Sequence, residues 1–276
     1  MTSLYALLFF AALASAVAAW LWGPPLRAGW RRMRVRRQPF PQAWREILRR
    51  RMPAFARLPA DVQLQLKKHA RVLLAEKPFI GCGGLVVTDE MRVLIATQAS
   101  LLLLNRRAGY FPNLRQVLVY PGAFVVDRPA AGLGGLTRDE RRVLAGESWQ
   151  QGQVILSWDD VLAGAADPGD GRNVVIHEFA HQLDQESGFA NGAPFLGRRD
   201  RYARWAAVLG FEFAALQQRL ARGEPGLIEA YAATDAAEFF AVVSELFFER
   251  PADLAAAHPA LHEEFAHYYC TQPLHW

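Results

Sequence analysis

The chain has 276 residues, of which 52% are hydrophobic, so it is long enough and apolar enough to bury a globular core. Its formal charge of +4 is unevenly spread: residues 26–71 carry a net +12, which leaves about −8 for the remainder and argues against nucleic acid as a direct partner. With only two cysteines, Cys82 and Cys270, a disulfide framework is excluded and a reducing compartment is favoured.

Residues 1–25 predict an N-terminal transmembrane anchor. Residues 4–22 carry no charge and would rise about 28 Å as a helix, close to the thickness of a bilayer core. Pro24 and Pro25 are expected to end this helix, and a basic juxtamembrane linker follows at 26–38. Because Lys and Arg favour the cytoplasmic side, we expect a single pass through the inner (cytoplasmic) membrane, with the body of the chain in the cytoplasm. A cleaved signal peptide and a helix lying on the membrane surface are the alternatives.

The body of the chain, residues 39–276, is predicted to form one domain. Apolar spacing and chain-breaking residues predict strands at 116–120, 123–127 and 154–158. Helices are expected within 40–77 and over 91–104, 200–222, 236–249 and 258–269. The predicted class is therefore α+β, with a small sheet first and mostly helices afterwards.

The most informative motif is His-Glu-Phe-Ala-His at 177–181, on a helix that Asn173 or Asp170 can cap. Two histidines four residues apart lie on one helix face, so both imidazoles can reach one point. Two neutral imidazoles, a carboxylate and a water make a zinc site with an open position. Glu178 would lie beside the metal as a base for its bound water. The alternative interpretation is a helix with two ordinary surface histidines.

A catalytic zinc usually needs a third protein ligand. Asp184 and Ser187 stand where a three-histidine motif would have glycine and histidine, so that type of site is excluded. The candidates further along the chain are Glu229, Asp235, Glu238, Glu245 and His258. Glu238 and Glu245 share one apolar helix face, where a metal or a metal-bound histidine would remove the cost of burying a carboxylate. Glu238 could instead close a capping box with Asp235.

Seven stretches of the chain together carry a resemblance to a known family. They are HEFAHQLD at 177–184, YAATDAAEFFAVVSE at 231–245, GESW at 146–149, VILSW at 154–158, DGRNVV at 170–175, TDEMR at 88–92 and VYPG at 119–122. Roughly over residues 40–272, the chain resembles the Mlc titration factor A family of zinc peptidases. The resemblance implies a zincin-like metallopeptidase domain whose catalytic core is similar to that of anthrax lethal factor, with aminopeptidase-type activity on a peptide or protein substrate.

The resemblance also implies roles for individual residues. By position, His177, His181 and Glu238 match the ligands of the zinc ion, and Glu178 matches the general base. Tyr231 matches a tyrosine beside the metal, where a phenol could donate to the developing oxyanion. For Tyr231 the alternative is a packed aromatic with its hydroxyl group at the surface.

Three further expectations concern neighbours of this site and its partners. Asp184 could hold a ligand histidine in its tautomer, or it could bond to a local loop. The strand at 154–158 could align an extended peptide by strand addition. The family name records binding of a transcriptional repressor, so the alternative function is a regulatory protein that sequesters such a repressor, with hydrolysis secondary.

Overall fold

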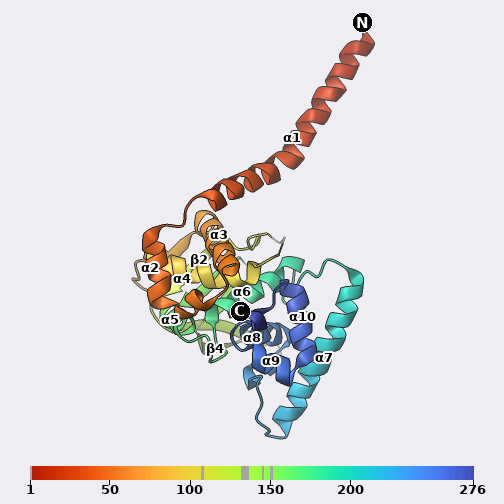
Figure 1. Cartoon of the computed structure of the whole chain (residues 1–276). Coiled ribbons are helices and arrows are strands. Elements are labelled where there is room, and N and C mark those ends of the chain that lie inside the picture. The colour runs from red at the N-terminus through yellow and green to blue at the C-terminus, as the bar shows by residue number, and fades with distance from the viewer. Residues whose placement is uncertain (1, 107–108, 132–136, 145, 150–151) are drawn as a thin grey trace. The chain divides into compact units, whose positions relative to one another are not determined.

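The computed structural model divides into two compact units, Met1–Pro39 and Phe40–Trp276 (Figure 1). The residues that it describes are 2–106, 109–131, 137–144, 146–149 and 152–276.

The N-terminal unit is one long helix, α1 (Thr2–Arg37). Pro24 and Pro25 lie inside this helix, so the uncharged stretch 4–22 runs on into the arginine-rich part instead of ending at the prolines. Among the described residues, no helix is long and apolar enough to cross a bilayer. The predicted transmembrane anchor and the predicted single-pass localisation in the inner membrane were therefore wrong. The helix end expected at the two prolines does not exist either.

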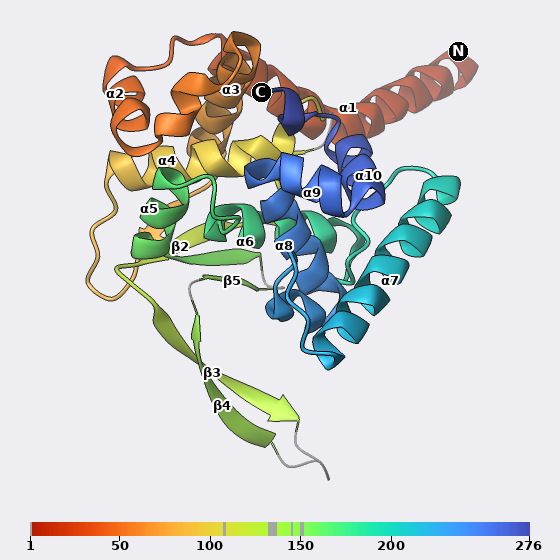
Figure 2. The ribbon, with the colours of Figure 1, turned by 60° about the horizontal axis from the view of Figure 1, so that its bottom comes forward.

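A small sheet with the strand order β1-β2-β6-β5 runs through the second unit (Figure 2). β1 (Phe79–Gly81) pairs parallel with β2 (Gln116–Tyr120), and β2 pairs parallel with β6 (Gln153–Ser157). β5 (Gly146–Trp149) pairs antiparallel with β6 and forms the second edge of the sheet. Four consecutive residues of β6, from position 154 to 157, are buried, as expected for a strand in the middle of a covered sheet.

Along the chain, helices come both before and after the strands. Those before the metal-site motif, with their short 3₁₀ turns, are α2 (Gln42–Arg51), η1 (Pro53–Arg57), α3 (Ala60–Glu76), α4 (Asp89–Ala99), η2 (Ser100–Leu103) and α5 (Trp158–Ala166). The predicted buried helix over 91–104 lies in α4 and η2, whose residues 93–103 are all buried. Thr88 starts α4 by accepting a hydrogen bond from the backbone N–H of Met91.

The C-terminal part is entirely helical. Its elements are α6 (Val174–Asp184), η3 (Gln185–Ser187), α7 (Arg199–Ala221), η4 (Ala230–Ala233), α8 (Ala236–Glu249), α9 (Pro251–Ala257), α10 (Pro259–Tyr269) and η5 (Pro273–His275). Aromatic side chains hold these helices together: Trp205 of α7 stacks on Phe265 of α10 with ring centroids 5.4 Å apart, and both rings contact Phe240 of α8. Figure 2 shows α7 to α10 gathered on one side of the sheet, with α6 between them and the strands.

The predicted α+β class was wrong. The domain is mostly helical, and three strands of its small sheet are parallel. Two parallel neighbours need a crossover connection, and α4 lies between β1 and β2 in the chain. A separate antiparallel pair, β3 (Phe124–Ala131) with β4 (Thr137–Leu144), lies between β2 and β5 in the chain. A helix, α4, therefore separates β1 from the other strands, which follow one another in the chain from β2 to β6.

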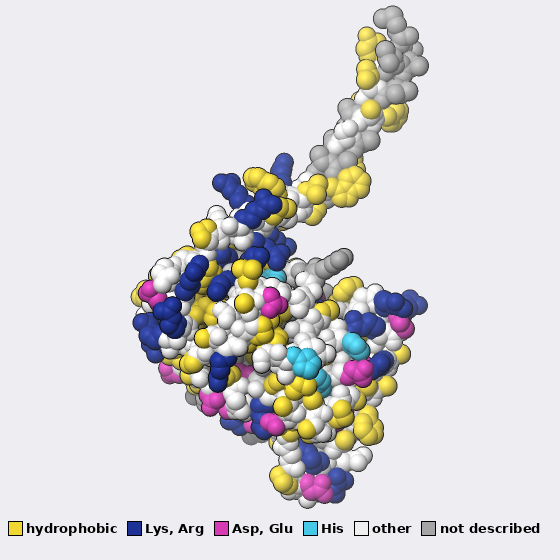
Figure 3. All heavy atoms as spheres, in the orientation of Figure 1, with side chains coloured by type: hydrophobic (Ala, Val, Ile, Leu, Met, Phe, Trp, Pro, Cys, Tyr) yellow, Lys and Arg dark blue, Asp and Glu magenta, His cyan; other side chains and the backbone are white. Residues whose placement is uncertain are grey.

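The surface of the second unit carries its positive charge unevenly. Figure 3 shows Lys and Arg side chains gathered around α2, which contributes Arg45, Arg49, Arg50 and Arg51. Two of these arginines, Arg50 and Arg51, form ion pairs with Glu90 of α4. Both pairs are solvent-exposed on the arginine side, so they stabilise the fold only slightly.

Candidate metal centre

The helix α6 starts at Asn173, one of the two predicted caps. The side-chain oxygen of Asn173 accepts hydrogen bonds from the backbone N–H groups of Val175 and Ile176, each at 3.1 Å. Asp170, the other predicted cap, instead accepts the backbone N–H of Arg172 at 2.8 Å, within the preceding turn. The cap starts the helix four residues before the first histidine of the motif.

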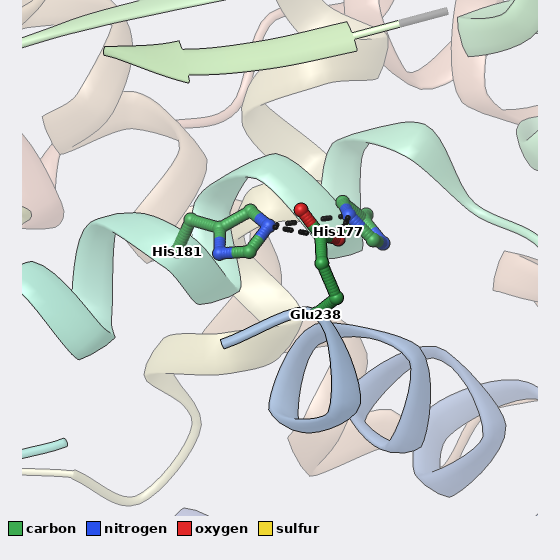
Figure 4. A group of neighbouring side chains, drawn as sticks. All are labelled: His177, His181 and Glu238. Carbon is green, nitrogen blue, oxygen red and sulfur yellow. Dashed lines mark hydrogen bonds and ion pairs between the residues drawn. The ribbon is translucent and has the colours of Figure 1, made fainter. Parts of the chain in front are cut away.

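The helix α8 starts at Asp235, whose side chain caps it, so the side chain of Glu238 is not needed as a cap. Asp235 Oδ1 accepts hydrogen bonds from the backbone N–H groups of Ala237 and Glu238, each at 2.9 Å. The carboxylate of Glu238 points away from this helix start, toward the histidines of α6 (Figure 4). Only half of a capping box is therefore formed, and Glu238 does not serve as a cap.

Three side chains from α6 and α8 converge on one point (Figure 4). His177 Nε2 lies 3.0 Å from Glu238 Oε2 and 3.2 Å from His181 Nε2, and His181 Nε2 lies 3.5 Å from the same carboxylate oxygen. The three side chains are 10–19% exposed, so the cluster reaches the surface at the edge of a buried helix pair. The structure thus brings together the predicted set His177, His181 and Glu238.

The spacing of these three atoms fits a tetrahedral divalent ion. Ligand bonds of about 2.0–2.1 Å in tetrahedral geometry keep neighbouring ligand atoms about 3.3–3.4 Å apart, close to the three distances above. Two imidazoles and one carboxylate are also a donor set that zinc accepts in open, catalytic sites. The residues present therefore fit such an ion.

The acidic side chains around His177 favour a positive charge at the cluster. Burial by itself would lower the pKa of His177, but the charge of Glu245 and hydrogen bonds with Glu238 and Glu245 raise that pKa well above its usual value. Burial would likewise raise the pKa of Glu238, but hydrogen bonds with His177 and His181 hold it well below its usual range. An anionic Glu238 beside two imidazoles is the charge state in which it could bind a metal.

Glu178 lies buried next to the cluster. Its residue is 4% exposed, and burial raises the pKa of its carboxyl to about 7 against the opposing influence of His177 and His181. Within the part of the chain that the structure describes, its Oε2 has no hydrogen-bond partner. A carboxyl with a pKa near neutrality is suited to taking up and releasing a proton.

Tyr231, in η4, lies beside the first histidine of the motif. Its ring centroid is 6.0 Å from that of His177, and the residue is 48% exposed. The tyrosine therefore is not packed into the core, and its ring lies beside the first histidine of the cluster.

The remaining candidate ligands lie elsewhere. Glu229 forms an exposed ion pair with Arg172 at 2.7 Å, and His258 Nδ1 lies 2.8 Å from a carboxylate oxygen of Glu212. Asp235 is engaged as the cap of α8. None of these three belongs to the convergent cluster found among the described residues.

Two acids near the cluster have different hydrogen-bond partners. Glu245 Oε1 lies 2.8 Å from His177 Nδ1, whereas Asp184 accepts the backbone N–H of Gly192 at 2.8 Å in the loop that follows α6. The spacing of seven residues between Glu238 and Glu245 predicted their common face. No sequence signal connected Glu245 with the backbone of Asn173, which also donates a hydrogen bond to it.

Comparison with known proteins agrees with this geometry. The family model of the glucose-regulated metallo-peptidase M90 family matches residues 27–270. An uncharacterised protein of Synechocystis is 40% identical over 259 residues, which cover 94% of each chain. Mlc titration factor A of Enterobacter and that of Klebsiella pneumoniae are each 36% identical over 234 residues, which cover 84% of this chain and 86% of theirs.

These matches extend over both helices of the cluster and over most of each relative, so they concern the whole domain and not an isolated motif. The predicted resemblance is confirmed, and a metallopeptidase family implies a bound metal and a peptide substrate. The chain belongs to the Mlc titration factor A family of M90 metallo-peptidases.

Proposed function

We propose that the chain is a zinc-dependent peptidase of the aminopeptidase type, with His177, His181 and Glu238 as the zinc ligands. The observation that carries the proposal is the convergence of two imidazole nitrogens and one carboxylate oxygen within 4.8 Å of one another. Zinc bound there would supply a Lewis acid for the scissile carbonyl and a water of lowered pKa.

Glu178 is the proposed general base. Its buried carboxyl takes the proton of the attacking water and then delivers that proton to the leaving amine. Tyr231, whose ring lies beside that of His177, donates a hydrogen bond to the oxyanion.

An extended peptide requires a free strand edge, and the predicted strand at 154–158 does not offer one. β6 is paired on both sides, with β2 and with β5, so it cannot accept a further strand. β5 has only one partner among the described strands, and it contacts α6. We therefore assign strand addition to the backbone of β5, next to the helix that carries the histidines.

Replacement of the proposed base tests this mechanism. Glu178→Gln is expected to retain stoichiometric zinc and to lose roughly 100-fold or more of kcat, because the amide cannot take the proton. Zinc content is measured by elemental analysis and turnover with amino-acid p-nitroanilides. Glu224→Gln, at an exposed ion pair with Arg222, is the matched control and should retain full turnover. Normal turnover of the Glu178 variant would exclude this residue as the base.

The aminopeptidase type is tested separately, with substrates that differ only at the N-terminus. An alanine p-nitroanilide with a free amine should be cleaved, and its N-acetylated form should not. Equal cleavage of the two, or cleavage of a longer peptide only at internal bonds, would identify an endopeptidase instead and leave the proposed metal centre intact.

A second proposed function follows from the names of the relatives, which are called Mlc titration factor A. This chain could likewise bind a transcriptional repressor similar to Mlc and withhold it from other partners. A pull-down of such a repressor with the His177→Ala variant separates the two functions. Retained capture by a zinc-free, inactive variant supports sequestration, whereas no capture by the wild-type chain excludes it.

A further inference from the structure

Two hydrogen-bond donors converge on the carboxylate of Glu245, between α6 and α8. Oε1 lies 2.8 Å from His177 Nδ1, and Oε2 accepts the backbone N–H of Asn173, the residue that caps α6. Glu245 is 7% exposed. Both oxygens of the carboxylate are therefore engaged on the helix that carries the histidines.

This arrangement selects one tautomer of His177. The backbone N–H of Asn173 can only donate, so it fixes Oε2 of Glu245 as an acceptor. With Oε2 accepting from Asn173, Oε1 is placed to accept from His177 Nδ1, which is the nitrogen that keeps its proton when Nε2 binds a metal. The Nε2 atom, which lies within 3.2 Å of both other members of the cluster, can then offer its lone pair to an ion in place of the hydrogen bond to Glu238.

Asn173 is itself held by several elements. Its side-chain Nδ2 donates to Gln98 Oε1 of α4 and to Glu249 Oε1 at the end of α8, each at 2.9 Å. Its Oδ1 caps α6, and the residue is 3% exposed. A Cβ at Gly164 of α5 would lie 3.1 Å from the side chain of Asn173, so the glycine leaves the room that this amide needs.

We propose that Glu245 and Asn173 are positioning residues of the metal centre, which hold His177 in the Nδ1-protonated tautomer so that its Nε2 lone pair faces the ion. The inference rests on the proposed zinc site and deepens it. Partners that orient a ligand histidine in this way typically change metal affinity by roughly 10- to 100-fold.

Glu245→Gln tests the proposal, because glutamine offers one acceptor to two donors. If its oxygen pairs with the N–H of Asn173, its NH₂ group faces His177 Nδ1 and moves the imidazole proton to Nε2. We expect zinc affinity of the full-length chain to fall roughly 10- to 100-fold in competition with a chelator. The ¹⁵N spectrum of histidine-labelled, zinc-loaded protein should show a hydrogen-bonded N–H at Nδ1 of His177 in the wild type, and that signal should shift or disappear in the variant.

The control is Glu249→Gln, the same substitution one helical turn further along α8. Glu249 bonds to the side chain of Asn173 and not to His177, so zinc affinity should stay within about threefold of wild type. A zinc-loaded wild type in which His177 carries no proton on Nδ1 would overturn the proposal, even if the Glu245 variant fails to fold, and so would unchanged zinc affinity of that variant. Retention of zinc by His177→Ala would overturn the metal centre itself, which is a different outcome.

Discussion

Glu249, at the end of α8, brings an ionisable carboxyl into the interior. Glu249 lies next to the buried amide of Asn173, and burial raises the pKa of its carboxyl to about 8. The hydrogen bond from Asn173 opposes this rise, while the charges of Glu245 and Asp170 increase it. Below pH 8 the folded chain therefore keeps this carboxyl mostly protonated, and an ionised Glu249 is a cost to the fold.

The pH dependence of stability should report this cost. Because the folded-state pKa lies above the ordinary value of 4.5, stability is complete below about pH 4.5 and declines as the pH rises through 8. We expect Glu249→Gln, which keeps an oxygen for Asn173, to match wild type near pH 5 and to exceed it at pH 8 by on the order of a few kcal/mol. Urea unfolding at several pH values measures the difference.

The exposed Glu224→Gln substitution is the control for this pH series, since Glu224 lies at a solvent-exposed ion pair. Its stability profile should run parallel to that of the wild type. Parallel profiles for the Glu249 variant and the wild type would contradict a raised pKa at this position.

At the scale of elements, Gly192, in the loop after α6, packs closely against the start of α8. Its φ of +74° is in the left-handed region, and a Cβ there would lie 2.3 Å from the backbone oxygen of Ala236. Its N–H donates to Asp184 and its carbonyl accepts from Trp205. The glycine therefore allows the two helices that carry the cluster to approach each other.

Gly192→Ala should consequently damage both the fold and the metal centre. Left-handed backbone alone costs about 1–2 kcal/mol for alanine, and the contact with Ala236 adds to this and displaces the turn that bears Glu238. Gly197→Ala is the matched control, with a φ of +79° and no atom within 4 Å of the added Cβ. We expect a larger fall in Tm for Gly192→Ala and a loss of zinc affinity in that variant only. Equal effects of the two substitutions would show that the contact is unimportant.

Elements with strong local signals could be predicted from the sequence. The cap at Asp235, the buried helix over 91–104 and the strand at 116–120 all depend on neighbouring residues, and the structure contains them. Pro24 and Pro25 misled the prediction, because a proline penalises a helix without forbidding it. Parallel pairing of β1, β2 and β6 joins segments far apart in the chain, and local periodicity carries no information on such partners.

At the scale of the whole molecule, the unit Phe40–Trp276 has a core of its own. Phe40, Leu48 and Leu66 near its start are buried, as are Phe265 and Tyr269 near its end. We expect a chain lacking residues 1–39 to fold cooperatively, to bind zinc with wild-type affinity and to have a Tm within a few degrees of the full chain. Thermal unfolding and zinc competition measure this. A shortened chain without a cooperative transition would show that α1 is needed for folding.

The candidate site was predictable to the extent that family motifs covered it. His177 and His181 follow from their spacing, while Glu238 could not be separated from a helix cap by local reasoning and was assigned by resemblance. Its orientation toward the histidines depends on the packing of α6 against α8, which joins residues 61 positions apart. The bond between Asn173 and Gln98 spans 75 positions and involves two amides with no motif around them.

The division of labour between Asp235 and Glu238 has a consequence for how this centre can vary. The side chain of Asp235 caps α8, so the side chain at position 238 is not needed to start the helix. In the proposed zinc site, an imidazole, a thiolate or an amide placed there would change which ion is preferred, while the cap of α8 stays in place. Metal preference and helix stability are thus separate properties, and each can be altered without the other.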